Sequence, residues 1–175
     1  MSVDSPYLVP TDGSFRIDDA RTRPPRDTPG EKKLKRELED CVERFADLQR
    51  VLYADDHHSL LLVFQAMDAA GKDSTIRNVL SGVNPAGCQV HAFKQPSKEE
   101  LDHDFLWRSS CRLPERGRIG VFNRSYYEEV LVVRVHPEYL EAQRLPHDVP
   151  LDELWPQRFA SIREHEAHLT RNGTH

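Results

Sequence analysis

The 175-residue chain lacks the features that define several large classes of protein. It has no apolar run near the ~20 residues needed to span a bilayer, and no basic start followed by an apolar stretch, which would mark a secretion signal. Its three cysteines have no metal-ligand spacing, so neither a disulfide framework nor a zinc site is expected. The net charge of −5 argues against a general nucleic-acid binder. We expect a cytoplasmic protein that binds neither membrane nor nucleic acid.

Positive charge is concentrated in the middle of the chain. Residues 71–135 contain ten Lys and Arg against eight Asp and Glu, whereas residues 1–70 contain ten against fourteen and residues 136–175 four against seven. A local excess suits a small or linear polyanion bound in one cleft. The same difference also arises by chance, so it carries weight only together with the motifs below.

Two regions are expected along the chain. Residues 1–27 are rich in Pro, Asp and Arg and lack hydrophobic periodicity, which predicts an extended or disordered arm. Residues 28–175 carry the apolar patterns of one core domain. Thr28 and Glu31 are spaced as a capping box, and the apolar stripe that follows predicts a helix ending near Ala54.

Short apolar segments then alternate with helical patterns. The predicted strands are residues 59–64, 89–93 and 118–122, and the first has the continuous apolar run typical of a strand buried on both faces. The predicted helices cover residues 75–80, a segment opened by a capping box of Ser97 and Glu100, a segment opened by a capping box of Ser125 and Glu128, and a last helix opened by Pro156. This alternation predicts an α/β fold with a parallel sheet.

The stretch QAMDAAGKDST, residues 65–75, lies between a predicted strand and a predicted helix. Such a bend binds phosphates in α/β proteins because the helix N-terminus offers free N–H groups. It departs from the usual P-loop pattern, since Ala66 and Asp73 replace a glycine and a hydroxyl residue. The candidate phosphate-binding residues here are Ala70, Gly71, Lys72, Asp73 and Ser74.

A carboxylate within a phosphate loop needs an explanation. Asp68 has a structural interpretation, in which it caps its own turn by accepting backbone N–H groups. The functional interpretation is that a Mg²⁺ ion separates it from the phosphates, or that it acts on the incoming acceptor. With Asp73 and Lys72 close by, the segment suits a site that handles two phosphate-bearing substrates with metal ions.

A second polar segment follows the third predicted strand, at the sheet edge where ligands bind. Asn123 stands where a P-loop kinase often has an acid, and Arg124 is able to pair bidentately with phosphate. Glu128 and Glu129 are candidates to replace that acid, although Glu128 also fits the capping box. Lys94, after the second strand, either contacts phosphate or is a solvated loop lysine.

Four segments, taken together and in this order, resemble the polyphosphate kinase 2 family. They are residues 65–73 (QAMDAAGKD), 83–87 (VNPAG), 93–97 (FKQPS) and 121–129 (VFNRSYYEE). The resemblance implies a three-layer P-loop kinase fold similar to thymidylate kinase. It implies transfer of a phosphoryl group, with Mg²⁺, between inorganic polyphosphate and a nucleotide of the AMP or ADP type.

The resemblance also implies roles for individual residues. Asp68, Lys72 and Arg124 are the expected catalytic residues, and Asp68 is also the expected metal ligand. Lys94 and Asn123 join the phosphate-binding residues of the loop. Glu128 and Glu129 are expected on the nucleotide side.

The chain also departs from the family pattern. Members of the family continue with another strand and a basic lid, so the fold is expected to be incomplete at the C-terminus and to lack that lid. The alternatives to the polyphosphate-dependent enzyme are therefore an inactive polyphosphate-binding or assembly module and an ATP-dependent nucleotide kinase. A homo-oligomer is expected in each case.

Overall fold

The computed structural model describes residues 5, 7–20, 23–145 and 149–175. The chain forms two compact units, Met1–Arg36 and Glu37–His175. The described part of the first unit holds one short 3-10 helix, η1 (Ile17–Asp19), and the first residues of helix α1 (Glu31–Asp55). Residues 1–4, 6 and 21–22 of the predicted arm lie outside the described residues, and the predicted boundary at residue 28 stays a prediction. Among the described residues, no helix is long and apolar enough to cross a membrane.

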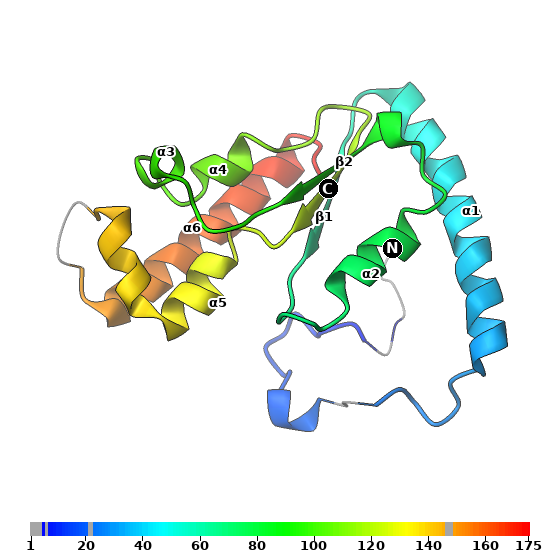
Figure 1. The fold of residues 1–175 in the computed structure, drawn as a ribbon, viewed down its shortest axis with the longest axis horizontal. Coiled ribbons are helices and arrows are strands. Elements are labelled where there is room, and N and C mark those ends of the chain that lie inside the picture. The colour runs from blue at the N-terminus through cyan, green and yellow to red at the C-terminus, as the bar shows by residue number, and fades with distance from the viewer. Residues whose placement is uncertain (1–4, 6, 21–22, 146–148) are drawn as a thin grey trace. The chain divides into compact units, whose positions relative to one another are not determined.

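A three-stranded parallel sheet lies in the second unit (Figure 1). The strands run in the order β1 (Leu60–Phe64), β3 (Ile119–Asn123) and β2 (Cys88–Ala92). The register pairs Asn123 with Phe64 on one side and with Ala92 on the other, so the carboxyl ends of all three strands meet at one edge. The predicted α/β fold with a parallel sheet is confirmed.

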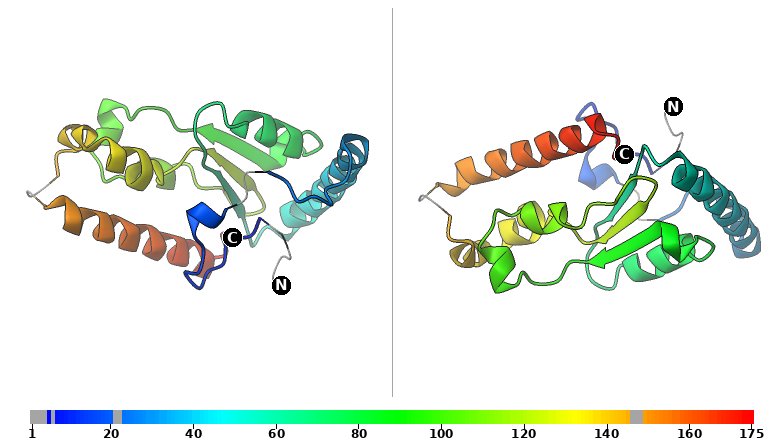
Figure 2. Two further views of the ribbon diagram at one scale, coloured as in Figure 1. Left: turned by 90° about the horizontal axis from the view of Figure 1, so that it is seen from below. Right: turned by 90° about the horizontal axis from the view of Figure 1, so that it is seen from above.

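Helices connect and flank these strands. The α-helices are α1 (Glu31–Asp55), α2 (Lys72–Val79), α3 (Lys98–Leu101), α4 (Trp107–Ser110), α5 (Glu128–Val135) and α6 (Leu151–Arg171). Two further 3-10 segments are η2 (Pro85–Gly87) and η3 (Pro137–Gln143). Helices α5 and α6 pack side by side, as the views in Figure 2 show.

Apolar clusters cover both faces of the sheet and give it three layers. Because side chains of a strand alternate between faces, Val121 and Phe122 of β3 enter different clusters. The Val121 cluster includes Ile76 of α2, and Phe45 and Leu52 of α1 pack against it. The other cluster joins the sheet to α5 and α6, and its buried members are Phe93, Phe122, Tyr126, Val130 and Ile162. Each such side chain stabilises the fold by about 1.5–3 kcal/mol.

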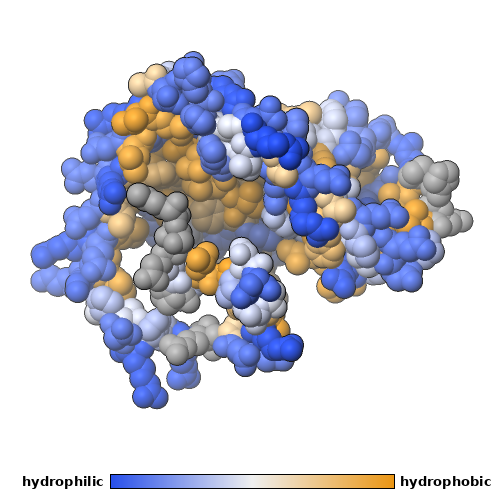
Figure 3. Space-filling model, turned by 180° about the vertical axis from the view of Figure 1, so that it is seen from behind, coloured by the Kyte–Doolittle hydropathy of each residue, from blue (hydrophilic) through white to orange (hydrophobic). Residues whose placement is uncertain are grey.

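The prediction of a strand buried on both faces applies better to β3 than to β1. The residues of β1 are only half-buried along its length, whereas four of the five residues of β3 are fully buried. The stripe predicted on α1 is also only partly covered, since Leu38 and Leu48 stay 40% and 56% exposed. On the face shown in Figure 3, apolar residues gather in one region and polar residues cover most of the rest.

The helix starts predicted at Thr28 and Pro156 are wrong, and the helix predicted from residue 75 begins earlier, at Lys72. The Thr28 hydroxyl donates to the carbonyl of Pro25 at 2.7 Å instead of capping a helix, and α1 begins at Glu31. The last helix begins at Leu151, with Pro156 inside it. Proline removes one helical hydrogen bond. The side chains of Leu154 and Trp155, in the same turn, are buried, and the helix continues through Pro156.

The capping box of Ser97 and Glu100 is confirmed, but the helix it opens is short. The single helix predicted after Ser97 is two helices, α3 and α4. The break has a local cause, because the Asp104 carboxylate accepts the backbone N–H of Leu106 at 2.9 Å and starts a new turn.

After α6 the chain returns to the outer edge of β1. Gly173 takes the left-handed conformation expected of a helix C-cap, with φ of 79°. Thr174 then pairs in parallel with Ser59, and the N–H of Leu61 donates to the carbonyl of His175 at 2.7 Å. Residues 174–175 therefore extend the sheet beside β1.

Candidate functional site

The loop between β1 and α2 contains two residues in the left-handed backbone region. Gly71 has a φ of 87° and Ala69 a φ of 63°. Gly71 lies directly before α2, where its conformation turns the chain into the helix and leaves the first N–H groups of α2 without helical partners. The bend predicted from the sequence is therefore present, with Lys72 as the first helical residue.

Lys72 and Lys94 are the cations of this edge that have no anionic partner among the described residues. Lys72 is half-buried at the start of α2, and Lys94 is exposed just after β2. The backbone carbonyl of Lys94 accepts a bond from Arg108 at 2.7 Å, which holds the loop that carries it. Both ammonium groups are available to an anion.

The hydroxyl of Ser74 is turned back onto the loop. It donates to the carbonyl of Gly71 at 2.7 Å, and the hydroxyl of Thr75 donates to the same carbonyl at 3.0 Å. Asp73 faces β3 instead, because its carboxylate accepts a bond from the Asn123 side chain at 2.6 Å. Asn123 thus joins the end of β3 to the start of α2.

The guanidinium of Arg124 lies between two carboxylates of different elements. It donates to Asp68 of the loop and, at 3.2 Å, to Glu128 of α5. The backbone N–H of Arg124 donates to the carbonyl of Phe64, which holds Arg124 beside the end of β1. Burial acts to lower the pKa of Arg124, but Glu128 and Asp68 outweigh that effect and the pKa is raised. Arg124 is therefore a fixed positive charge.

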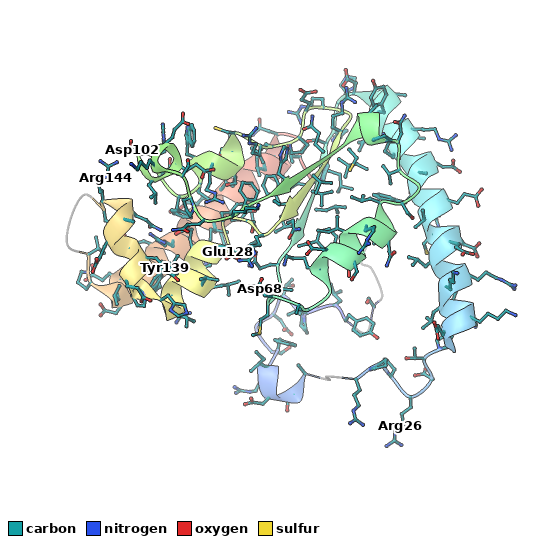
Figure 4. All side chains as sticks on the ribbon, in the orientation of Figure 1. Arg26, Asp68, Asp102, Glu128, Tyr139 and Arg144 are labelled. Carbon is teal, nitrogen blue, oxygen red and sulfur yellow. The ribbon has the colours of Figure 1, made fainter. Side chains whose placement is uncertain are left out.

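The Asp68 side chain is 84% exposed, whereas that of Glu128 is 21% exposed. Figure 4 shows the two residues close together at the end of the strands. Among the described residues, the Asp68 carboxylate accepts a hydrogen bond from Arg124 rather than from a backbone N–H. The capping interpretation of Asp68 therefore has no support in the structure, and its carboxylate lies at the rim of the site.

The capping box predicted for Ser125 and Glu128 is wrong. Ser125 accepts the N–H of Tyr127 at 3.1 Å, and no side chain caps α5, which begins at Glu128 itself. The Glu128 carboxylate instead accepts bonds from Arg124 and from the side-chain amide of Gln65. Glu128 therefore does not have the helix-capping role that its spacing suggested.

Gln65 is a site residue that the sequence analysis did not identify. It directly follows β1, at the sheet edge where ligands bind, and this position was the signal available in the sequence. Its amide N–H donates to Glu128, while its carbonyl oxygen is buried without a partner among the described residues.

Glu129 lies in a buried polar network rather than at the edge of the sheet. Its carboxylate accepts bonds from Arg158 at 2.9 Å and from Gln143 at 2.6 Å. Burial lowers the pKa of Arg158, and Glu129 opposes that shift. The guanidinium also lies over the rings of Phe105 and Trp155, at 5.1 and 5.7 Å. This network links α5, η3 and α6, and the nucleotide-side role of Glu129 stays a prediction.

Replacing Glu129 by glutamine tests the structural contribution of this network. Glutamine keeps the volume but leaves the Arg158 side chain, 4% exposed, without its counter-ion. We expect the free energy of unfolding, measured by urea denaturation, to be about 3 kcal/mol lower than that of the unchanged protein. Glu141→Gln, on an exposed residue of η3, is the matched control. Unchanged stability together with weaker nucleotide binding would favour the ligand role instead.

A cavity of about 340 Å³ opens beside Arg124 and Glu128. Aromatic and basic side chains share its wall with aliphatic ones: they include Phe93, Phe105, Tyr126, Tyr139, Lys94, Arg108 and Arg124. Apolar walls with a few convergent charges are typical of sites for small organic ligands that carry an anionic group. The cavity therefore adjoins the edge of the sheet that carries Arg124, on the side of α5.

A parallel sheet whose strand ends present a left-handed glycine bend, lysines and an arginine is the arrangement of the P-loop kinase fold. Comparison with known proteins identifies the family within this class. The sequence profile described as "Polyphosphate kinase 2 (PPK2)" matches residues 29–175, and the chain belongs to that family.

Relatives of known function share this assignment. The ADP-polyphosphate phosphotransferase of Rhodopseudomonas palustris is 62% identical over 78% of this chain and 48% of its own length. The AMP/ADP-polyphosphate phosphotransferase of Meiothermus ruber is 41% identical over 96% of this chain and 59% of its own. The chain thus spans about half the length of these relatives.

The fold has a counterpart of known structure. The crystal structure of polyphosphate kinase 2 from Arthrobacter aurescens TC1 superposes with a TM-score of 0.81 and 36% sequence identity. The superposition covers 93% of this chain and 55% of the crystallised one. At this level of identity the likeness extends to the family as well as to the fold.

Proposed function

We propose that this chain transfers a phosphoryl group between inorganic polyphosphate and a nucleoside mono- or diphosphate. The observation that carries the proposal is the guanidinium of Arg124, which lies between Asp68 and Glu128 next to the bend that ends in Lys72. The family relatives named for polyphosphate, AMP and ADP support the substrate classes.

On the phosphate side, several donors converge on one place. The free N–H groups of α2, the ammonium of Lys72 and the guanidinium of Arg124 together stabilise the charge that develops on the transferred group. Arg124 exchanges its bond with the exposed Asp68 for bonds to phosphate oxygens, because a bidentate phosphate contact is of the same strength. That exchange frees Asp68 when substrate is bound.

On the nucleotide side, the cavity beside α5 receives the acceptor. Its aromatic wall, with Phe93 and Tyr139 among its members, packs against a nucleobase, and its basic residues Lys94 and Arg108 face the phosphates. Glu128 separates this cavity from the loop. It orients Arg124 toward the phosphate that lies between the two substrates.

Magnesium fits the residues at this edge only in part. The described residues contain no group of three acidic or other metal-binding side chains. Mg²⁺ is usually held by one or two carboxylates together with substrate phosphates and water, and the exposed carboxylate of Asp68 supplies one such oxygen. The bound ion would neutralise phosphate charge beside that carboxylate, which accounts for an acid in a phosphate loop.

A coupled assay tests the proposal. The purified chain is incubated with Mg²⁺ and AMP or ADP, with either polyphosphate or ATP as donor, and nucleotide products are followed. We expect product that depends on polyphosphate. Product with ATP alone would instead indicate a conventional nucleotide kinase, and binding of polyphosphate without turnover a non-catalytic module. The homo-oligomer and the cytoplasmic location stay predictions.

A further inference from the structure

The turn that joins β3 to α5, residues 124–127, carries the central cation of the site but has no regular structure. Arg124 begins it in the left-handed region, with a φ of 64°. A non-glycine residue in that region is strained and persists only when its surroundings hold it there. The contacts that hold the turn therefore bear on where the guanidinium lies.

One side-chain anchor of this turn comes from a distant helix. One carboxylate oxygen of Glu166, in α6, accepts a hydrogen bond from the hydroxyl of Tyr126 at 2.9 Å and another from the hydroxyl of Tyr127 at 2.5 Å. Hydrogen bonds to a charged acceptor are about twice as strong as neutral ones. Burial, together with Glu166, raises the pKa of both hydroxyls, so both remain donors at neutral pH.

Tyr126 and Tyr127 connect Glu166 to the residues around Arg124. Tyr126 is 4% exposed in the cluster that covers one face of the sheet, and the ring of His165 meets its ring edge-on at 5.6 Å. Tyr127 immediately precedes Glu128, whose carboxylate binds Arg124. With both hydroxyls held on one oxygen, the half of the turn next to α5 cannot rotate without breaking a charge-assisted bond.

We propose that Glu166 is a positioning residue for phosphoryl transfer. Through Tyr126 and Tyr127 it holds the turn so that Arg124 and Glu128 face the bound phosphates. The inference rests on the proposed function for its consequence in turnover. Its consequence for anion binding does not need turnover, since a misplaced Arg124 also loses contacts with bound polyphosphate.

The test compares Glu166→Leu and Glu166→Gln in the full chain. Leucine removes the acceptor, whereas glutamine keeps an acceptor oxygen for the hydroxyls. We expect Glu166→Leu to lower kcat/KM for polyphosphate about tenfold, as loss of a partner that orients a site residue does, and to weaken polyphosphate binding, measured by calorimetry, by about fivefold. Glu166→Gln should stay within about threefold of the unchanged protein in both readouts. Glu164→Leu, at an exposed position of the same helix, is the matched control.

A purely structural role would lower the melting temperature but leave kcat/KM and the dissociation constant unchanged per folded molecule, and that result would overturn the inference. A double-mutant cycle gives a second decision. In an Arg124→Ala background, Glu166→Leu should cause no further loss, and additive losses would show that Glu166 does not act through Arg124. If the unchanged protein shows no turnover, the proposed function fails, while the binding measurements still decide the role of Glu166.

Discussion

Replacing Asp68 by asparagine is expected to lower the rate of polyphosphate-dependent phosphoryl transfer by a factor on the order of 10²–10³. Asparagine has the same shape and keeps a carbonyl oxygen that accepts the bond from Arg124. What it loses is the negative charge, which under the proposed function would hold a hard cation beside the phosphates. The expected loss therefore reports on charge rather than on folding, because the side chain is 84% exposed.

Initial rates at several Mg²⁺ concentrations are the measurement for Asp68→Asn. The metal concentration for half-maximal rate should rise as the rate falls, because one carboxylate ligand is missing. Asp40→Asn, an exposed substitution on α1, is the control and should be neutral. A wild-type rate in Asp68→Asn would refute the metal-binding role and would leave Asp68 as a counter-ion of Arg124.

Replacing Lys72 by alanine is expected to lower kcat by a similar factor, on the order of 10²–10³. Lys72 begins α2 at the glycine bend, and its ammonium group has no anionic partner among the described residues, so its removal breaks no ion pair there. Alanine also favours the helix. The loss should therefore appear in catalysis without a loss of stability.

Single-turnover rates and thermal unfolding, measured on the same preparation, check the effect of Lys72→Ala. Arg77→Ala removes a basic residue from the last turn of the same helix and should leave the rate within about twofold, as exposed substitutions away from the reacting groups do. A Lys72→Ala protein with unchanged kcat and a raised KM would place the ammonium in ground-state binding alone.

Local sequence patterns predicted the bend and the strands around it. The apolar runs of β1 and β3 and the Gly71-Lys72 pair lie where expected, because a strand is a local apolar run and a left-handed turn favours glycine. Prediction was weaker for helix starts. Thr28 and Glu128 both satisfied a capping pattern, yet the Thr28 hydroxyl bonds to Pro25 and the Glu128 carboxylate to Arg124.

The sequence did not predict which partner each charged side chain of the site contacts. Glu128 and Glu129 are neighbours in the chain, but one faces Arg124 at the sheet edge and the other is buried against Arg158. Consecutive residues at the start of a helix point about 100° apart, so the packing of α5 decides which of them enters the site. Gln65 and Glu166 gain their contacts with this region in the same way.

The sequence by itself determined the family, the parallel α/β arrangement and the bend that ends in Lys72, because each depends on residues close together in the chain. Only the tertiary structure decided that Arg124 lies between Asp68 and Glu128, and that Glu166 holds the turn before α5. The physical reason is that the contacts of Arg124 with Asp68 and of Glu166 with the turn join segments far apart in the chain. Their geometry follows from how the helices pack on the sheet.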